Sequence, residues 1–313
     1  MHLKRRHFLH LLGTLSAAYP LARAAAQTDW DRERPIVATM RQTLEQAFAG
    51  KDMALDLRCI NDQQDLEFTI QIRPFEFFPV ASCFKAFVAY YYFFSTPESE
   101  WEANEGTSVY RMIVFSDNVA TGAVLADTAD RVLTSSNPIE KFNDFLFERV
   151  GIYSGLHTWD WTGSRTIGFR DPRYEPSGVR LVTYNDEVYS VDNVFTAAAL
   201  AHGFDVLLRG QVFAKWERMQ RAVQATYDLL SIPAANYRSP IERIFTQGYT
   251  GKDGVLPATD LPVGRVINDA GVVSYEGRRY IIAYLSMGEG DLAADDALEV
   301  VRQQIERYQG DSN

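Results

Sequence analysis

The chain has 313 residues and a formal net charge of −10, and 46% of its residues are hydrophobic and 13% aromatic. This length suits one large domain or two interleaved ones, and the apolar content is sufficient for a real core. The negative charge argues against a nucleic-acid-binding protein. The two cysteines, Cys59 and Cys83, permit a disulfide but do not predict one.

Residues 1–26 have the features of an export segment. The pair Arg5-Arg6 precedes an apolar run, and three alanines at 24–26 form a small-residue cleavage site. We expect export by the twin-arginine route, with an ordinary secretory signal or an uncleaved anchor as the alternatives. No second apolar span follows, so the mature protein, 27–313, is predicted to be periplasmic or secreted, with no stable membrane span.

The first elements of the mature chain are predicted from their periodicity. Apolar residues recur every four positions over 35–48, which predicts an amphipathic helix. Residues 53–60 and 66–72 are predicted to be two strands around a polar turn.

The stretch 78–94 predicts a buried helix, because every residue after Lys85 as far as Phe94 is apolar or aromatic. An ammonium on such a helix must be paired or hydrogen-bonded. Ser82 lies one helical turn earlier, beside the free N–H groups of the helix start, as an activated nucleophile would. The alternative is that Ser82 caps the helix and Lys85 reaches water.

The rest of the chain returns from helices to strands. Residues 151–192 show little periodicity and predict a long irregular loop. Helices are predicted at 109–114, from 119, at 139–150, 193–208, 212–230 and 292–308, and strands at 243–249, 265–275 and 279–286. This order predicts an α+β fold: one antiparallel five-stranded sheet flanked by the N- and C-terminal helices, with an inserted all-helical lobe.

Three short motifs occur in order along this layout: Ser82-Cys83-Phe84-Lys85, Ser116-Asp117-Asn118, and Thr250-Gly251 near a late strand. Together they resemble the S-x-x-K, S-D-N and K-T-G motifs of class A β-lactamases and penicillin-binding D,D-peptidases. The resemblance covers essentially the whole mature chain. It implies an α/β lobe at about 27–81 and 211–313 and a helical lobe at about 82–210.

The resemblance also implies roles for individual residues. Ser82 would attack a carbonyl and become acylated, with Lys85 as base or proton relay. Ser116 would pass the proton to the leaving nitrogen, and Asn118 would bind the substrate amide and Lys85. The oxyanion would lie between the backbone N–H groups of Ser82 and Lys252. By itself, the Ser-Asp-Asn run also fits an ordinary cap between two helices.

The third motif departs from the family pattern. Tyr249 stands before Thr250-Gly251 where the family has lysine, and a neutral hydroxyl binds a carboxylate more weakly than an ammonium does. Lys252 is near, but strand alternation directs it away from the face that Tyr249 uses. Tyr249, Thr250, Gly251 and Lys252 are the predicted substrate-binding residues of this strand.

Class A β-lactamases also carry a glutamate, in an E-P-x-x-N-like segment, that activates the deacylating water. The similar segment here is Glu175-Pro176, with Val179 in the asparagine position. Glu175 is therefore the predicted general base, with a solvated loop carboxylate as the alternative. Other acids in this loop are Asp160, Asp171 and Glu187.

No metal or other cofactor is predicted, because the mature chain has only His157 and His202, without a ligand pattern around them. The predicted function is an exported serine hydrolase that forms an acyl-enzyme at Ser82, with a β-lactam as the first substrate class. The alternatives are a D,D-peptidase, amidase or esterase acting on a peptidoglycan-like peptide, and a non-catalytic binding protein with a degenerate site.

Overall fold

A computed structural model describes most of the chain from Arg34 onward. The described residues are 34–131, 137–153, 155–156, 158–159, 169–170, 181–184, 187–190, 193–213, 217–235, 237–246, 248–256 and 264–312. The predicted export segment and Glu175 lie outside these residues. Among the described residues, no helix has both the length and the apolar character to cross a bilayer.

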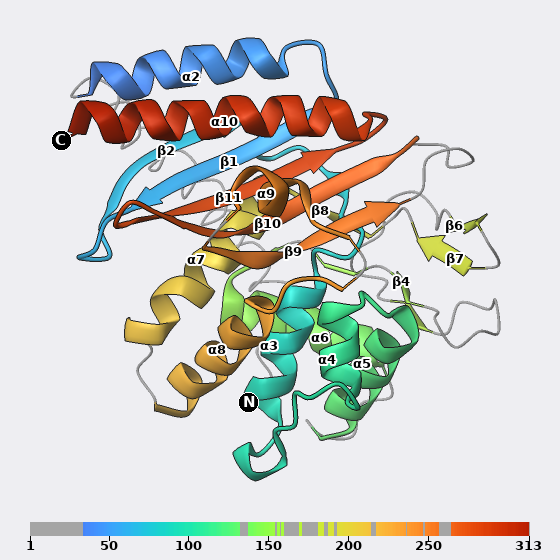
Figure 1. Ribbon diagram of the computed structural model, residues 1–313. Helices are drawn as coiled ribbons and strands as arrows, with labels where there is room; N and C mark the ends of the chain where they lie inside the picture. Colours follow the sequence, from blue (N-terminus) through green and yellow to red (C-terminus); the bar gives the residue numbers. More distant parts are fainter. Residues whose placement is uncertain are drawn as a thin grey trace, which may run out of the picture.

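The centre of the molecule is a five-stranded antiparallel sheet with the strand order β2-β1-β11-β10-β9. Its strands are β1 (Met53–Ile60), β2 (Leu66–Ile72), β9 (Tyr249–Leu256), β10 (Val266–Tyr275) and β11 (Arg278–Ser286). Two strands from the start of the chain thus pair with three from its end (Figure 1). This confirms the predicted α+β fold and its five-stranded sheet.

One face of the sheet is covered by α2 (Pro35–Phe48) and α10 (Asp291–Ser312), which lie side by side in Figure 1. Pro35 occupies the first turn of α2, where a missing N–H costs nothing. The predicted four-residue spacing places Met40, Leu44 and Phe48 in the core between this helix pair and the sheet. Full burial of one such side chain contributes about 1.5–3 kcal/mol.

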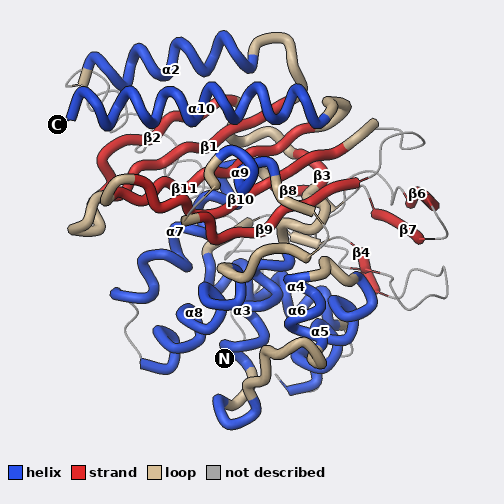
Figure 2. Tube along the Cα trace, viewed as in Figure 1, coloured by secondary structure: helices blue, strands red, loops and turns tan. Residues whose placement is uncertain are grey.

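The other face carries a helical lobe, separated from the first helical layer by the sheet in Figure 2. Its helices are α3 (Lys85–Ser95), α4 (Ser108–Val114), α5 (Asn118–Arg131), α6 (Pro138–Phe145) with the π-helical turn η2 (Leu146–Val150), α7 (Ala197–Phe213) and α8 (Glu217–Leu230), besides the short turn η1 (Glu98–Glu100). The apolar α3 is surrounded by α4, α5, α6 and α8. The buried helix predicted from the sequence is therefore confirmed.

Several predicted boundaries are wrong. The expected lobe boundary at residue 210 lies inside α7, and α8 packs against α3 and α7, so the helical lobe extends to Leu230. The expected strand at 243–249 is instead the short helix α9 (Pro240–Ile244) and a loop. Ser239 caps that helix by accepting a hydrogen bond from the Glu242 amide, and the strand begins only at Tyr249.

The segment 151–192, expected to be irregular, contains short antiparallel ladders in its described parts. β4 (Thr158–Trp159) pairs with β5 (Phe169–Arg170), and β6 (Leu181–Tyr184) pairs with β7 (Glu187–Ser190). After it, β8 (Val194–Phe195) pairs with β3 (Phe78–Pro79). The helix expected from residue 193 therefore starts later, where Thr196 Oγ1 accepts a hydrogen bond from the Ala199 amide.

Candidate active site

Lys85 is fully buried at the start of α3, and its ammonium reaches the second motif. Nζ donates to the backbone carbonyl of Ser116 at 2.7 Å, to Ser116 Oγ at 3.3 Å and to Asn118 Oδ1 at 2.7 Å. A buried ammonium needs such acceptors, because desolvation of an unpaired charge is expensive. The structure therefore brings Lys85, Ser116 and Asn118 together.

The junction between α4 and α5 holds Ser116 in place. Ser116 has the left-handed φ of +56°, which an L-residue adopts only when its surroundings enforce it. The next residue, Asp117, caps α5 by accepting from the Ala120 amide at 2.9 Å and pairs with Arg111 at 2.6 Å. Burial acts to raise the pKa of Asp117, but these hydrogen bonds outweigh it and lower that pKa.

Ser82 is half-buried in the turn that leads into α3. Its carbonyl accepts a hydrogen bond from the Lys85 amide at 3.0 Å, so the two residues are one turn apart, as the sequence predicts. The preceding residue, Ala81, has a φ of +50°. Backbone strain of this kind costs about 1–3 kcal/mol and is concentrated at functional sites.

The turn that carries Ser82 is fixed to the central sheet. Asn268 on β10 donates from Nδ2 to the Pro79 carbonyl at 2.6 Å and accepts from the Ser286 amide at 3.0 Å. The Val80 amide donates to the Asn193 carbonyl at 2.8 Å. Asn268 is not among the site residues predicted from the sequence motifs, and its positioning role follows from these two contacts.

The strand residue beside Ser82 is Gly254, not Gly251. A Cβ on Gly254 would lie 2.6 Å from the Ser82 amide nitrogen, whereas one on Gly251 would meet the Tyr249 hydroxyl and the Ala270 carbonyl. Along β9, Thr250, Lys252 and Gly254 alternate on the buried side. The strand segment that approaches Ser82 is thus Lys252-Asp253-Gly254, three residues after the predicted Tyr249-Thr250-Gly251.

Tyr249 lies on the opposite face of β9 from Lys252 and packs against the core beneath α2 and α10. Its hydroxyl donates to Oδ1 of the fully buried Asp269, whose Oδ2 accepts from the Ile241 amide at 2.7 Å. Burial, together with the Asp269 carboxyl, raises the pKa of Tyr249 well above its usual range. The prediction that Tyr249 replaces the motif lysine is wrong, while the predicted opposite orientation of Lys252 is confirmed.

The proposed oxyanion role of the Lys252 amide is also wrong. The Ser274 amide donates to the Gly248 carbonyl at 2.9 Å, and in an antiparallel pair such bonded positions alternate. The register pairs Lys252 with Ala270, so the Lys252 N–H points into the ladder. The N–H of Val255, one residue beyond Gly254, points away from β10 toward the free edge of the sheet.

The remaining member of the predicted set on this strand, Thr250, is buried, and its Oγ1 lies 2.9 Å from Ser231 Oγ in the loop after α8. Thr250 therefore fastens β9 to the helical lobe. Cys83, next to Ser82, is fully buried, and desolvation raises its pKa well above the usual value, as expected of a core thiol. The described residues contain no group of three or more His, Cys, Asp or Glu side chains that could hold a metal.

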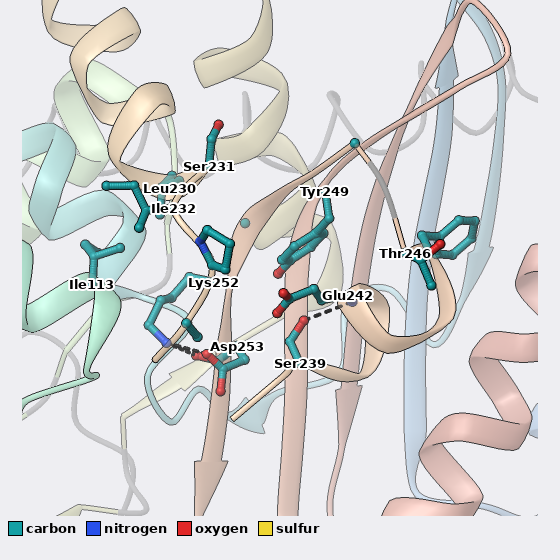
Figure 3. A pocket seen from close by; sticks show the side chains of 15 residues that line it. Ile113, Leu230, Ser231, Ile232, Ser239, Glu242, Thr246, Tyr249, Lys252 and Asp253 are labelled. Atoms are coloured by element: carbon teal, nitrogen blue, oxygen red, sulfur yellow. Dashed lines mark hydrogen bonds and ion pairs between the residues drawn. The ribbon is translucent and has the colours of Figure 1, made fainter. Parts of the chain in front are cut away.

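A cavity of about 210 Å³ adjoins β9. One wall is apolar and comes from α4, the end of α8 and the loop that follows it, with Ile113, Leu230 and Ile232 (Figure 3). Lys252 lies between this wall and Asp253, and its ammonium donates to the Asp253 carboxylate and, at 3.1 Å, to the Asp253 carbonyl.

No protein-family model and no curated protein matches this chain. Solved structures do match. The TLA-3 extended-spectrum β-lactamase aligns with a TM-score of 0.61 at 10% identity, over 87% of this chain and 98% of its own. The β-lactamase from Sphaerobacter thermophilus gives 0.56 at 18% identity, over 86% and 95%, and that from Chitinophaga pinensis gives 0.58 at 12%, over 88% and 100%.

The chain therefore has a β-lactamase-like fold, with helices on both faces of a five-stranded antiparallel sheet. At sequence identities this low, the structural match establishes the fold alone.

Proposed function

We propose that the protein is a serine hydrolase that forms an acyl-enzyme at Ser82. The observation that carries the proposal is the set of hydrogen bonds from buried Lys85 to Ser116 and Asn118, one turn after Ser82. If Ser82 only capped the helix and Lys85 reached water, the Lys85 ammonium would be exposed, whereas it is fully buried. The site also has the strained Ala81 and Ser116 that serve to preorganise reacting groups.

In the proposed acylation, the Lys85 ammonium first releases one proton to water. The resulting amine takes the proton of the Ser82 hydroxyl as Oγ forms a bond to the substrate carbonyl carbon. The resulting oxyanion accepts hydrogen bonds from the N–H groups of Ser82 and Val255. Ser116, within hydrogen-bond reach of Lys85, passes the proton to the leaving atom as its bond to carbon breaks. Water then hydrolyses the ester, and Glu175 is the proposed base for that water.

The first substrate class to test is the β-lactam amide, because the structural neighbours are β-lactamases. A D,D-peptidase, amidase or esterase is the second candidate. Within this group, the ion pair that Lys252 makes with Asp253 favours an amidase or esterase, because a D,D-peptidase substrate carries a carboxylate. A binding protein with a degenerate site is the third, and the complete Lys85 network speaks against it. We further propose export through residues 1–26 to the periplasm or the medium.

The experiment is covalent labelling of the mature protein with a fluorophosphonate and with a fluorescent penicillin. We expect an adduct that is absent from Ser82→Ala. Nitrocefin turnover then separates a β-lactamase from an enzyme with a stalled acyl adduct. Absence of labelling by both probes, in a protein with a cooperative melting transition, would contradict the proposal and favour the binding protein.

A further inference from the structure

The cavity beside β9 contains one cation, Lys252, among its described lining residues, and two carboxylates, Asp253 and Glu242. An anionic ligand group entering this cavity would therefore depend on Lys252. The opposite wall is apolar and includes Ile113 and Ile232.

Lys252 is already engaged. Its ammonium pairs with the Asp253 carboxylate, and the two side chains are only 3% and 12% exposed. Charges so little exposed are weakly screened by salt, so the pair is held more firmly than a surface ion pair. Asp253 thus occupies the position on Lys252 that a ligand carboxylate would take.

A ligand carboxylate would have two ways to bind, and both are unfavourable. It can displace Asp253, which leaves a carboxylate in a confined site without its partner. It can otherwise share Lys252 with Asp253, which brings two carboxylates together on one ammonium. A neutral group meets neither penalty, and its apolar substituent can pack against the apolar wall of the cavity.

We propose that this site selects acyl substrates that are uncharged next to the scissile bond, such as neutral esters or amides with an apolar substituent, and discriminates against carboxylate-bearing ones. Asp253 is the specificity-determining residue, because it neutralises Lys252 from within the chain. This inference rests on the proposed acyl-enzyme chemistry for its catalytic consequence, but the binding preference does not depend on that chemistry.

The test uses a matched pair of ligands, nitrocefin and its methyl ester, which differ only in the carboxylate. Binding is measured by calorimetry in the Ser82→Ala background, and acylation by absorbance in the protein with Ser82. We expect the ester to bind about tenfold more tightly than the acid, because only the acid brings a second carboxylate next to Asp253.

Asp253→Asn should free Lys252 and improve acid binding by about tenfold, with the ester changed by less than about threefold. If the asparagine variant folds poorly, Asp253→Thr replaces it, because threonine is favoured in strands, and we expect the same gain in acid binding. Glu242→Gln is the matched control, because it removes the same charge from the same cavity without freeing Lys252. It should change acid binding by less than about threefold.

Preference of the native protein for the acid, no binding of either ligand, or no gain in Asp253→Asn and Asp253→Thr would overturn the inference. Ester preference in the Ser82→Ala background without acylation of the protein that retains Ser82 would contradict the proposed function alone. Acylation that favours the acid would contradict only the specificity.

Discussion

Replacing Gly254 by alanine tests whether β9 meets the serine turn in the register described above. The new Cβ would lie 2.6 Å from the Ser82 nitrogen and 2.9 Å from both the Ala81 Cβ and the Cys83 nitrogen. Ordinary contact begins at 3.4 Å, so the turn and the strand must separate by about 0.8 Å. The atoms met are backbone atoms or a Cβ, so no side-chain rotation relieves the contact.

Overpacking of this kind costs about 1–3 kcal/mol of stability. Moving a reacting group by about 1 Å costs about 100-fold in rate. We therefore expect Gly254→Ala to lower the second-order rate of fluorophosphonate labelling by about 100-fold, which corresponds to about 2.7 kcal/mol. The melting temperature should fall by only the few degrees that the overpacking implies.

The control is Gly290→Ala, because a Cβ at Gly290 meets no atom within 4 Å. It should change stability by less than about 0.5 kcal/mol and leave the labelling rate unaltered. Labelling of Gly254→Ala at the native rate, with the native melting temperature, would refute the placement of Gly254 beside Ser82.

Three further substitutions test other parts of the account. Lys85→Met removes the proposed base and should slow labelling by about 10²–10⁴-fold in a protein that still melts cooperatively; a native rate would contradict its role. Tyr249→Phe removes one hydrogen-bond donor to Asp269 and should lower the free energy of unfolding in urea by about 1–3 kcal/mol, with the labelling rate unchanged. Slow labelling would show that Tyr249 contributes to the reaction at Ser82. Burial raises the pKa of Asp269 to about 7, so between pH 4 and pH 7 the folded protein holds a proton that the unfolded chain has released. Stability should therefore fall as pH rises through this range, by at most about 4 kcal/mol, and level off above it, and Asp269→Asn should flatten the profile; an already flat native profile would contradict the shift.

Much of the fold follows from periodicity. The four-residue apolar spacing predicts α2, and the run of apolar residues after Lys85 predicts α3. The two apolar stretches around a polar turn predict β1 and β2. The contact between Lys85 and the Ser116-Asp117-Asn118 run follows from the family resemblance and from the need of a buried ammonium for acceptors.

The sequence pattern predicts the strand next to the site too early, because the residues of that strand nearest Ser82 are poor strand formers. Gly, Lys and Asp are depleted in strands, so Lys252-Asp253-Gly254 carries little strand signal, whereas the apolar residues before Tyr249 carry more. The available signal was the spacing of Lys252 and Gly254. Residues two apart share a strand face, and a glycine is needed where a strand approaches another backbone closely.

The positions of Asn268 and Val255 could not be read from the sequence. Asn268 matters because it joins β10 to the Pro79 carbonyl, a contact across 189 residues of chain. The direction of the Val255 N–H depends on which residues of β9 hydrogen-bond to β10, and only the register of the two strands defines this.

The most direct test of the central claim is mass spectrometry of the mature protein after incubation with a fluorophosphonate, followed by peptide mapping. We expect a single covalent adduct on Ser82, formed rapidly in the native protein and slowly in Lys85→Met. An adduct on another residue, or none, would contradict the claim that Ser82 is the nucleophile.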